Sequence, residues 1–180
     1  RFGIVQKNGY ATVAVSTSST RRAWDFDGER WVPNQPLRKL FTEHSERASS
    51  GELGGDLGMR FRDLDGDGVC EIVAANSLQR TVWGFDAGTE SWVARDWKLP
   101  EALVIANRVG RDGGVRFLDL NEDGGLDLIV SNETQCGVWL FQDAKQGWGP
   151  AVFLHERGDP EADKRLPAIT VEGVNEGWAA

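Results

Sequence analysis

A repeat at an offset of 56 positions constrains this chain more than any other feature. Residues 59–85 and 115–141 align without a gap. Charged, glycine and aromatic positions match together, so the two stretches are predicted to be copies of one structural unit. The matched positions of the earlier copy are Arg60, Phe61, Asp63, Leu64, Asp67, Gly68, Ile72, Asn76, Val82, Trp83 and Phe85.

A degenerate copy begins the chain and a partial copy ends it. Setting Trp24 on Trp83 aligns the first copy at an offset of 59 positions, and Gly177 takes the place of the repeated glycine near the end. The sequence thus predicts a degenerate unit with a linker, two units with acidic loops and linkers, and the start of a further unit. Their boundaries are 1–58, 59–114, 115–167 and 168–180.

Within each unit, apolar residues alternate with period two, which predicts strands rather than helices. Surface loops are expected at 42–58 and 100–114, with one or two helical turns after Pro100. Four short antiparallel strands per unit are typical of a propeller blade, and a β-solenoid is the competing architecture. We therefore predict an all-β chain, a partial β-propeller of about three four-stranded antiparallel blades. The strands predicted for the second unit are 59–63, 70–75, 80–86 and 91–98.

The predicted number of blades is too small for a closed ring, since propellers have at least about four. We expect the chain to be a fragment of a larger propeller, for instance one of seven blades, or to assemble with further copies. The end units, with Trp24 in the first and Trp139 in the third, would then lack packing partners on one side. Trp24, Trp83 and Trp139 are expected to pack between blades, with a sugar-binding face as the alternative.

The composition excludes several classes of function. A net charge of −8 repels phosphate backbones, so nucleic acid is not an expected partner. The chain has no long apolar run, and no membrane span is predicted. Its two cysteines are too few for a disulfide framework and are expected as buried or free thiols. No nucleophile, general-base or cofactor motif occurs, so no catalytic residue is predicted.

Two acidic loops hold the strongest chemical signal. Residues 63–71 read DLDGDGVCE and residues 119–127 read DLNEDGGLD. Both place side-chain oxygens at positions 1, 3, 5 and 9, and the glycine at position 6 permits the sharp turn between them. This pattern, with a carbonyl at position 7, predicts two calcium sites. The predicted side-chain ligands are Asp63, Asp65, Asp67, Glu71, Asp119, Asn121, Asp123 and Asp127.

Other interpretations of these loops were weighed against calcium. Magnesium prefers stricter octahedral geometry, and zinc would require Cys or His ligands. An EF-hand would need a Glu at position 12, where Ala74 and Val130 stand. The loops could also be solvated turns, or a phosphotransfer motif of the haloacid dehalogenase type, although Asp67 replaces its threonine. The first unit has Ile4, Gln6 and Asn8 at the ligand positions, so no metal is expected there.

These two units resemble FG-GAP-like repeats, also called VCBS repeats, which form the blades of integrin-α-type propellers. The residues that carry the resemblance in the earlier unit are Arg60, Phe61, Asp63, Leu64, Asp65, Gly66, Asp67, Gly68, Glu71, Ile72 and Val73. In the later unit they are Phe117, Asp119, Leu120, Asn121, Asp123, Gly124, Asp127, Leu128, Ile129 and Val130. The units depart from the family by their length, by lacking a Gly-Ala-Pro string and by Glu71 at a usual Asp position.

The resemblance implies a calcium-binding propeller segment that acts as a non-catalytic recognition or scaffold module. Calcium would be held through loop positions 1, 3, 5, 7 and 9, which adds the carbonyls of Val69 and Gly125 to the ligands. A protein or glycan ligand, further blades, and an extracellular or periplasmic location are expected. The alternative is the propeller part of a larger bacterial enzyme, dehydrogenase-like or a sugar lyase, whose catalytic residues lie outside this chain.

Overall fold

The computed structural model shows a chain built from antiparallel sheets. Strand order is β1-β2-β3-β4 in the first sheet, β5-β6-β7-β8 in the second and β12-β11-β10-β9 in the third, and β13 and β14 form a small hairpin. The all-β prediction is confirmed for the sheets, to which two helices are added. The structure describes residues 2–16, 20–45, 56–97, 99–101, 103–107 and 109–175.

Each four-stranded sheet is a meander in which consecutive strands are neighbours. The first sheet comprises β1 Phe2–Gly3, β2 Thr12–Ser16, β3 Arg21–Phe26 and β4 Trp31–Pro33. The second comprises β5 Met59–Arg62, β6 Glu71–Ala75, β7 Arg80–Asp86 and β8 Ser91–Arg95. The third comprises β9 Val115–Leu118, β10 Asp127–Ser131, β11 Gln135–Asp143 and β12 Gly147–Glu156. The remaining elements are α1 Gln35–Ser45, α2 Pro160–Arg165, β13 Thr170–Val171 and β14 Val174–Asn175.

The three sheets share one strand register. The second and third strands of each sheet pair a branched apolar residue with a tryptophan, and the pairs are Val13–Trp24, Ile72–Trp83 and Leu128–Trp139. The third and fourth strands hold an aromatic contact at 5.5–5.6 Å between ring centroids, and these pairs are Phe26–Trp31, Phe85–Trp92 and Phe141–Trp148. Residues aligned in the sequence therefore occupy equivalent places in the three sheets.

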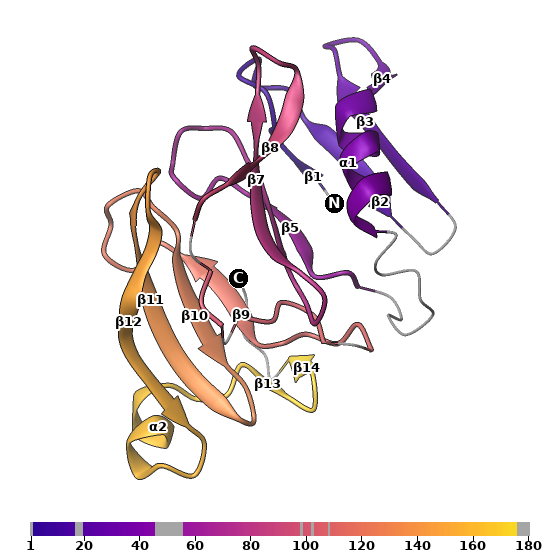
Figure 1. Cartoon of the computed structure of the whole chain (residues 1–180). Helices are drawn as coiled ribbons and strands as arrows, with labels where there is room; N and C mark the ends of the chain where they lie inside the picture. Colours follow the sequence, from indigo (N-terminus) through magenta and orange to yellow (C-terminus); the bar gives the residue numbers. More distant parts are fainter. Residues whose placement is uncertain are drawn as a thin grey trace.

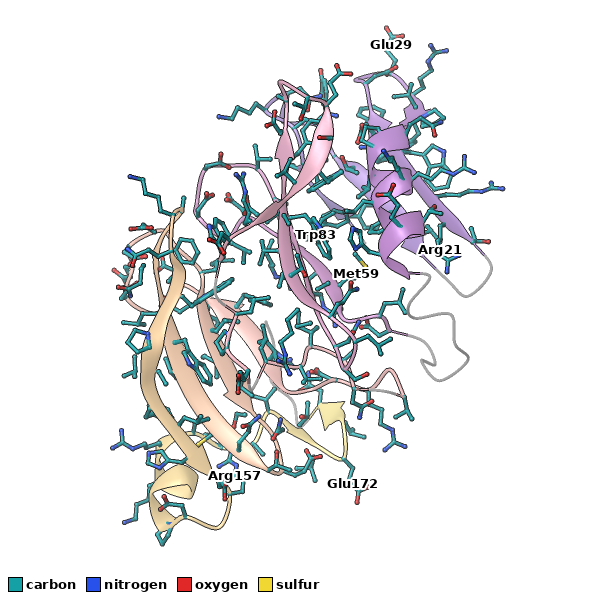
Figure 2. The ribbon with its side chains drawn as sticks, in the orientation of Figure 1. Arg21, Glu29, Met59, Trp83, Arg157 and Glu172 are labelled. Atoms are coloured by element: carbon teal, nitrogen blue, oxygen red, sulfur yellow. The ribbon has the colours of Figure 1, made fainter. Side chains whose placement is uncertain are left out.

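The second sheet lies between the other two and is covered on both faces (Figure 1). Every residue of β6 is buried, as expected for a strand with no solvent-facing side. One face packs on the first sheet and α1, where Figure 2 shows Met59 and Trp83 directed toward the helix. The other face packs on the third sheet. The buried residues between the second and third sheets include Leu64, Val73, Val82, Leu128, Val130 and Trp139.

The four strands predicted for the second unit are confirmed, and their ends agree to within one residue with one exception. The last strand was expected to reach residue 98, but β8 ends at Arg95. The chain leaves the sheet because Trp97 turns into the core, where its Nε1 donates to the Ala144 carbonyl at 2.9 Å. The indole also packs edge-on against Phe141 at 5.2 Å. Tryptophan packing between sheets is likewise confirmed for Trp83 and Trp139, which are 3% and 5% exposed.

Helix α1 was not predicted, although its first residues carry a recognisable start signal. The Asn34 side chain accepts a hydrogen bond of 2.8 Å from the Leu37 N–H, as an N-cap residue does. Leu37, Leu40 and Phe41 then share one helical face, and all three are buried beside the first sheet. The part of the expected loop 42–58 that precedes residue 46 is therefore helical, and residues 46–55 lie outside the described chain.

The expectation of a surface loop at 100–114 is wrong for residues 103–106, whereas Glu101, Val109 and Arg111 are exposed as expected. Leu103, Ile105 and Ala106 are buried, and the Ile105 N–H donates to the Ala75 carbonyl at 2.9 Å. The described residues of this segment form no helical turn like the one expected after Pro100. Leu103 and Ile105 instead pack in the cluster between the second and third sheets.

The described helices are too short or too polar for any of them to cross a membrane. The described sheets do not close on one another, and their assignment as propeller blades stays a prediction.

Candidate metal centre

The first acidic loop connects β5 to β6. The pairing of Arg62 with Glu71 across these antiparallel strands brings the two ends of the loop together. Asp63 follows β5 directly and Glu71 opens β6, so positions 1 and 9 of the loop are neighbours. The nine-residue spacing seen in the sequence is therefore the length of a hairpin connection whose ends both carry carboxylates.

Three of the predicted ligands converge in this loop. One carboxylate oxygen from each of Asp63, Asp65 and Glu71 lies within 4.8 Å of the others. In the described ranges, no other group of three or more His, Cys, Asp or Glu side chains comes together in this way. Asp67 does not belong to the group, and its Oδ1 accepts a hydrogen bond of 2.8 Å from the Val69 N–H. The Val69 carbonyl stays a predicted ligand.

The electrostatics of the loop favour a positive partner. Burial, with repulsion from Asp65 and Asp67, raises the pKa of Glu71 to about 7, against an ordinary value of 4.5. Burial and the charge of Asp67 also raise the pKa of Asp65. The Oδ1 atom of Asp63 is buried and has no hydrogen-bond partner. An unpaired buried carboxylate oxygen beside two acids with raised pKa values is the environment that a bound cation stabilises.

The loop holds this shape through backbone hydrogen bonds and two glycines. The Gly68 N–H donates to Asp63 Oδ2 at 2.9 Å, and the Leu64 N–H donates to Glu71 Oε2 at 3.1 Å. Gly66 and Gly68 have φ values of 72° and 86°, a region that favours glycine. Each of the two end carboxylates thus has one oxygen bound to the backbone, while Asp63 Oδ1 is left for a cation.

The second acidic loop, between β9 and β10, is arranged differently. Both oxygens of Asp127 accept backbone hydrogen bonds, from Leu120 N–H at 2.9 Å and from Phe141 N–H at 2.7 Å. The Oδ2 of Asp119 accepts from Gly124 N–H at 2.9 Å. Its carboxylates do not form a three-membered group among the described residues. The structure therefore gathers the ligands of one predicted site and not those of the other.

A side-chain contact replaces the missing cluster in this second loop. The Asn121 amide donates to Asp123 Oδ2 at 2.7 Å, and the Gly125 N–H donates to Asp123 Oδ1 at 2.9 Å. At the predicted ligand positions this loop has one carboxylate fewer than the first, since Asn121 stands where Asp65 stands there. The Asn121 amide supplies a donor that a carboxylate lacks, and Gly125 stays a predicted carbonyl ligand.

The two acidic loops touch. The Leu126 N–H donates to the Leu64 carbonyl at 2.8 Å. The α-carbon of Gly66 faces the Gly124 carbonyl so closely that a Cβ atom there would lie 2.5 Å from its oxygen. The equivalent amide of the second sheet, that of Cys70, donates to the Ile4 carbonyl of the first sheet.

The first unit has neutral residues at the loop positions where the others have acids, and its polar side chains gather around one carboxylate from the neighbouring strand. Thr12 occupies the position of Glu71, and its hydroxyl donates to Asp25 on the neighbouring strand. The amides of Gln6 and Asn34 donate to the same carboxylate at 3.2 Å and 3.0 Å. Asp25 lies outside the loop pattern, which is why the sequence did not single it out.

Two ion pairs that precede the acidic loops were not predicted from the sequence. Arg60 lies 2.9 Å from Asp56, and Arg116 lies 3.1 Å from Asp112. Both pairs have the spacing Asp-x-Gly-x-Arg, which was the available signal. They fix the start of β5 and β9, the first strands of the second and third sheets, and so help to position the loops that follow.

Of the two cysteines, Cys70 is half-buried and Cys136 is buried, and they form no disulfide with each other. In the partial copy predicted at the end of the chain, Glu172 lies in the turn between β13 and β14, and Gly177 lies outside the described residues.

Comparison of the chain with protein-family models, with curated proteins and with solved structures gives no match. The resemblance to FG-GAP-like repeats therefore stays a prediction from the sequence.

Proposed function

We propose that this chain is a calcium-binding β-propeller segment of the FG-GAP-like or VCBS type that serves as a non-catalytic recognition or scaffold module. The observation that carries the proposal is the convergence of Asp63, Asp65 and Glu71 around a buried oxygen without a partner. A cation would neutralise these carboxylates and fasten the β5–β6 hairpin. Its role in this proposal is structural.

The donor set favours calcium over other metals. All the side chains that converge are carboxylates, which suits a hard cation and excludes the Cys and His ligands typical of zinc. Extracellular calcium modules bind with dissociation constants of about 10⁻⁴–10⁻³ M, a range in which secreted proteins find their sites filled. An extracellular or periplasmic location is therefore part of the proposal.

The propeller arrangement is supported by three properties of the sheets. They share one meander order and one register, and the second sheet is packed on both faces. Hydrogen bonds between successive units run from equivalent amides, Cys70 and Leu126, to the preceding unit. Blades that each contact only their neighbours in the chain would pack in this way.

The recognition part of the proposal is supported by two grooves at equivalent places. One, of about 530 Å³, lies between α1 and the turn before β8, and the other, of about 470 Å³, lies between Asp96, Leu99 and Pro100 on one side and the turn before β12 on the other. Trp92, which is partly exposed, lines the first groove, whereas the matched Trp148 borders the second but is only 3% exposed. Aromatic rings beside polar groups suit a protein or glycan ligand. Glycan and peptide arrays probed with the chain and with Trp92→Ala test this part, and the absence of any binder that depends on Trp92 would contradict it.

Calorimetric titration of the chelated protein with calcium tests the metal site. We expect two sites, the tighter one in the first loop because it has one more carboxylate at the predicted ligand positions. Asp65→Asn should remove the tighter site, and Asp123→Asn should remove the weaker one. No heat of binding at millimolar calcium would refute the proposal.

A further inference from the structure

A pocket of about 450 Å³ borders the first strands of the second and third sheets, β5 and β9 (Figure 1). Three arginine side chains line it, Arg60 and Arg62 from β5 and Arg116 from β9. Residues two apart on a strand share one face, and β5 turns Met59 and Phe61 to the opposite face, toward the first sheet. In a chain of net charge −8, this gathering of positive charge is a local reversal of sign.

The base of this arginine pocket is apolar. Ile105 and Val115 are 3% and 6% exposed and belong to the buried cluster between the second and third sheets, against which Phe117 packs. All three residues also line the pocket. A cavity with an apolar base and a few convergent polar groups is the usual form of a site for a small molecule.

The three guanidinium groups are held in the same way. In each arginine, Nη1 donates to the carbonyl of the preceding residue, at 2.9 Å in Arg60 and at 2.8 Å in Arg62 and Arg116. Arg60 also donates to both oxygens of Asp56, and Arg116 lies 3.1 Å from Asp112. Groups that are fixed before a ligand arrives lose little conformational entropy when they bind it.

Arg116 keeps donors that no described residue uses. Its hydrogen bonds within the described ranges all leave from Nη1, so Nε and Nη2 have no partner there. The side chain is only 11% exposed, yet these two atoms are not among the sealed, unpaired polar atoms of the described chain. A guanidinium largely withdrawn from water, with donors to spare and no acceptor of its own, is completed by an acceptor that carries negative charge.

The charge of the pocket suits an anion of single charge. The three guanidinium groups are offset by Asp56 and Asp112, the two carboxylates that pair with them, which leaves one positive charge. Asn175 on β14, the remaining polar residue of the lining, is neutral. A carboxylate would bring the group to neutrality, whereas a phosphate dianion would leave it negative and would also face Asp112.

We propose that the arginine pocket binds a small organic acid. Its carboxylate lies against Arg116, because a planar guanidinium matches a carboxylate in a bidentate pair, and Arg60 and Arg62 add positive charge beside it. Its apolar part rests on the apolar base of the pocket. The proposal depends neither on the metal site nor on the two grooves described above.

Sodium benzoate, a carboxylate on an apolar ring, is the probe, and benzamide is its neutral counterpart. Each is added to the ¹⁵N-labelled full chain of 180 residues, and the amide resonances of residues 115–117 and the arginine Nε–H resonances are followed. A probe of this size should bind with a dissociation constant of about 1 mM. We expect saturable shifts at residues 115–117 with benzoate and an affinity about tenfold lower with benzamide, which lacks the charge. Added salt should weaken benzoate binding.

Three variants assign the binding to the pocket. Arg116→Gln should weaken benzoate binding by about tenfold, since it removes hydrogen bonds to a charged partner. Because this change also breaks the pair with Asp112, Arg62→Gln is the second variant, which leaves both ion pairs in place and should weaken binding by a smaller factor. Arg80→Gln is the matched control, because Arg80 on β7 is exposed and does not line the pocket. It should bind benzoate like the parent.

Four results would overturn the proposal. Absence of shifts at residues 115–117 with benzoate in the parent would show that the arginines serve only their aspartate partners. Benzamide binding as tightly as benzoate would show a pocket that accepts a ring regardless of charge. Tighter binding of inorganic phosphate than of benzoate would show a site for an inorganic anion instead. Equal weakening by Arg80→Gln would show a nonspecific attraction to positive charge.

Discussion

The Leu126 amide donates to the Leu64 carbonyl across 2.8 Å, and this bond joins the two acidic loops of neighbouring sheets. Leu64 is fully buried beneath the contact, and its own amide binds the Glu71 carboxylate. Asp63 and Asp65, two candidate metal ligands of the first loop, are therefore the direct chain neighbours of a residue that is hydrogen-bonded to the second loop. A change in one loop should be felt in its neighbour.

Calcium should stabilise the folded chain. A ligand that binds only the folded state adds about 2.7 kcal/mol when present at about a hundredfold excess over its dissociation constant. Thermal unfolding with chelator should therefore occur at a lower temperature than with calcium, and added calcium should restore it. Identical melting curves in the two buffers would contradict a structural cation.

Substitutions in each loop should show how much of the calcium-dependent stabilisation that loop contributes. Asp67→Ala and Asp123→Ala are each expected to reduce the calcium-dependent shift in melting temperature, because each removes a predicted ligand. Glu133→Ala, an exposed acid outside both loops, is the control and should leave the shift unchanged. If Asp123→Ala melts like the parent in both buffers, the second loop is a turn without a cation.

The sequence predicted the strands and the acidic loops well because the repeat marks equivalent positions. It did not predict α1, whose residues have no matched helix in the second unit, although Asn34 offered a capping signal. The burial of Leu103 and Ile105 was missed because a short apolar run within a charged linker does not by itself reveal a packing partner, and only the packing of two sheets decides where this segment lies. Pattern matching also treated the two loops as equal. Their difference depends on which backbone amides bind Asp127, which spacing alone does not reveal.

The stability of the cation-free protein should fall as pH rises from about 4.5 to about 7. Burial raises the pKa of Glu71 to about 7, while in the unfolded chain it titrates near 4.5. Between these values the folded state keeps a proton that the unfolded state has lost, so deprotonation favours unfolding. At about 1.4 kcal/mol for each pH unit, the loss amounts to roughly 3 kcal/mol.

Urea unfolding in calcium-free buffer at pH 5 and pH 7.5 measures this loss, and Glu71→Gln should remove most of it. Asp27, Asp86 and Asp143 do not interfere, because backbone hydrogen bonds lower their pKa values. Their contribution is lost only as pH falls below the ordinary carboxylate range. Equal stability of the parent at the two pH values would show that Glu71 is not buried as described.

The matched leucines of the second and third sheets should differ in their importance for stability. Leu64→Ala removes a fully buried side chain and should cost about 2–5 kcal/mol. Leu120→Ala, at the same position of the next unit, removes one that is 45% exposed and should cost less than about 1 kcal/mol at concentrations where the chain is monomeric. Chemical denaturation of the two variants gives both values. Similar costs would mean that Leu120 is covered in solution or that the sheets do not pack as described.

The contact between the acidic loops makes a further prediction, which separates two neighbouring glycines. Gly66 and Gly68 both have positive φ, at 72° and 86°, so alanine at either position adopts a conformation that costs about 1–2 kcal/mol. They differ in surroundings. A Cβ atom on Gly66 would lie 2.5 Å from the Gly124 carbonyl oxygen, whereas one on Gly68 would have nothing within 4 Å.

Gly66→Ala should therefore destabilise the chain more than Gly68→Ala, because it also forces the second loop away from the first. The free energies of unfolding of both variants, measured in urea at one calcium concentration, give the comparison. Gly66→Ala should in addition shift the amide resonances of residues 123–126, since the Leu126–Leu64 hydrogen bond lies beside the new methyl group. Gly68→Ala should leave those resonances in place. Equal destabilisation by the two substitutions, with unchanged resonances in the second loop, would show that the loops are not in contact in solution.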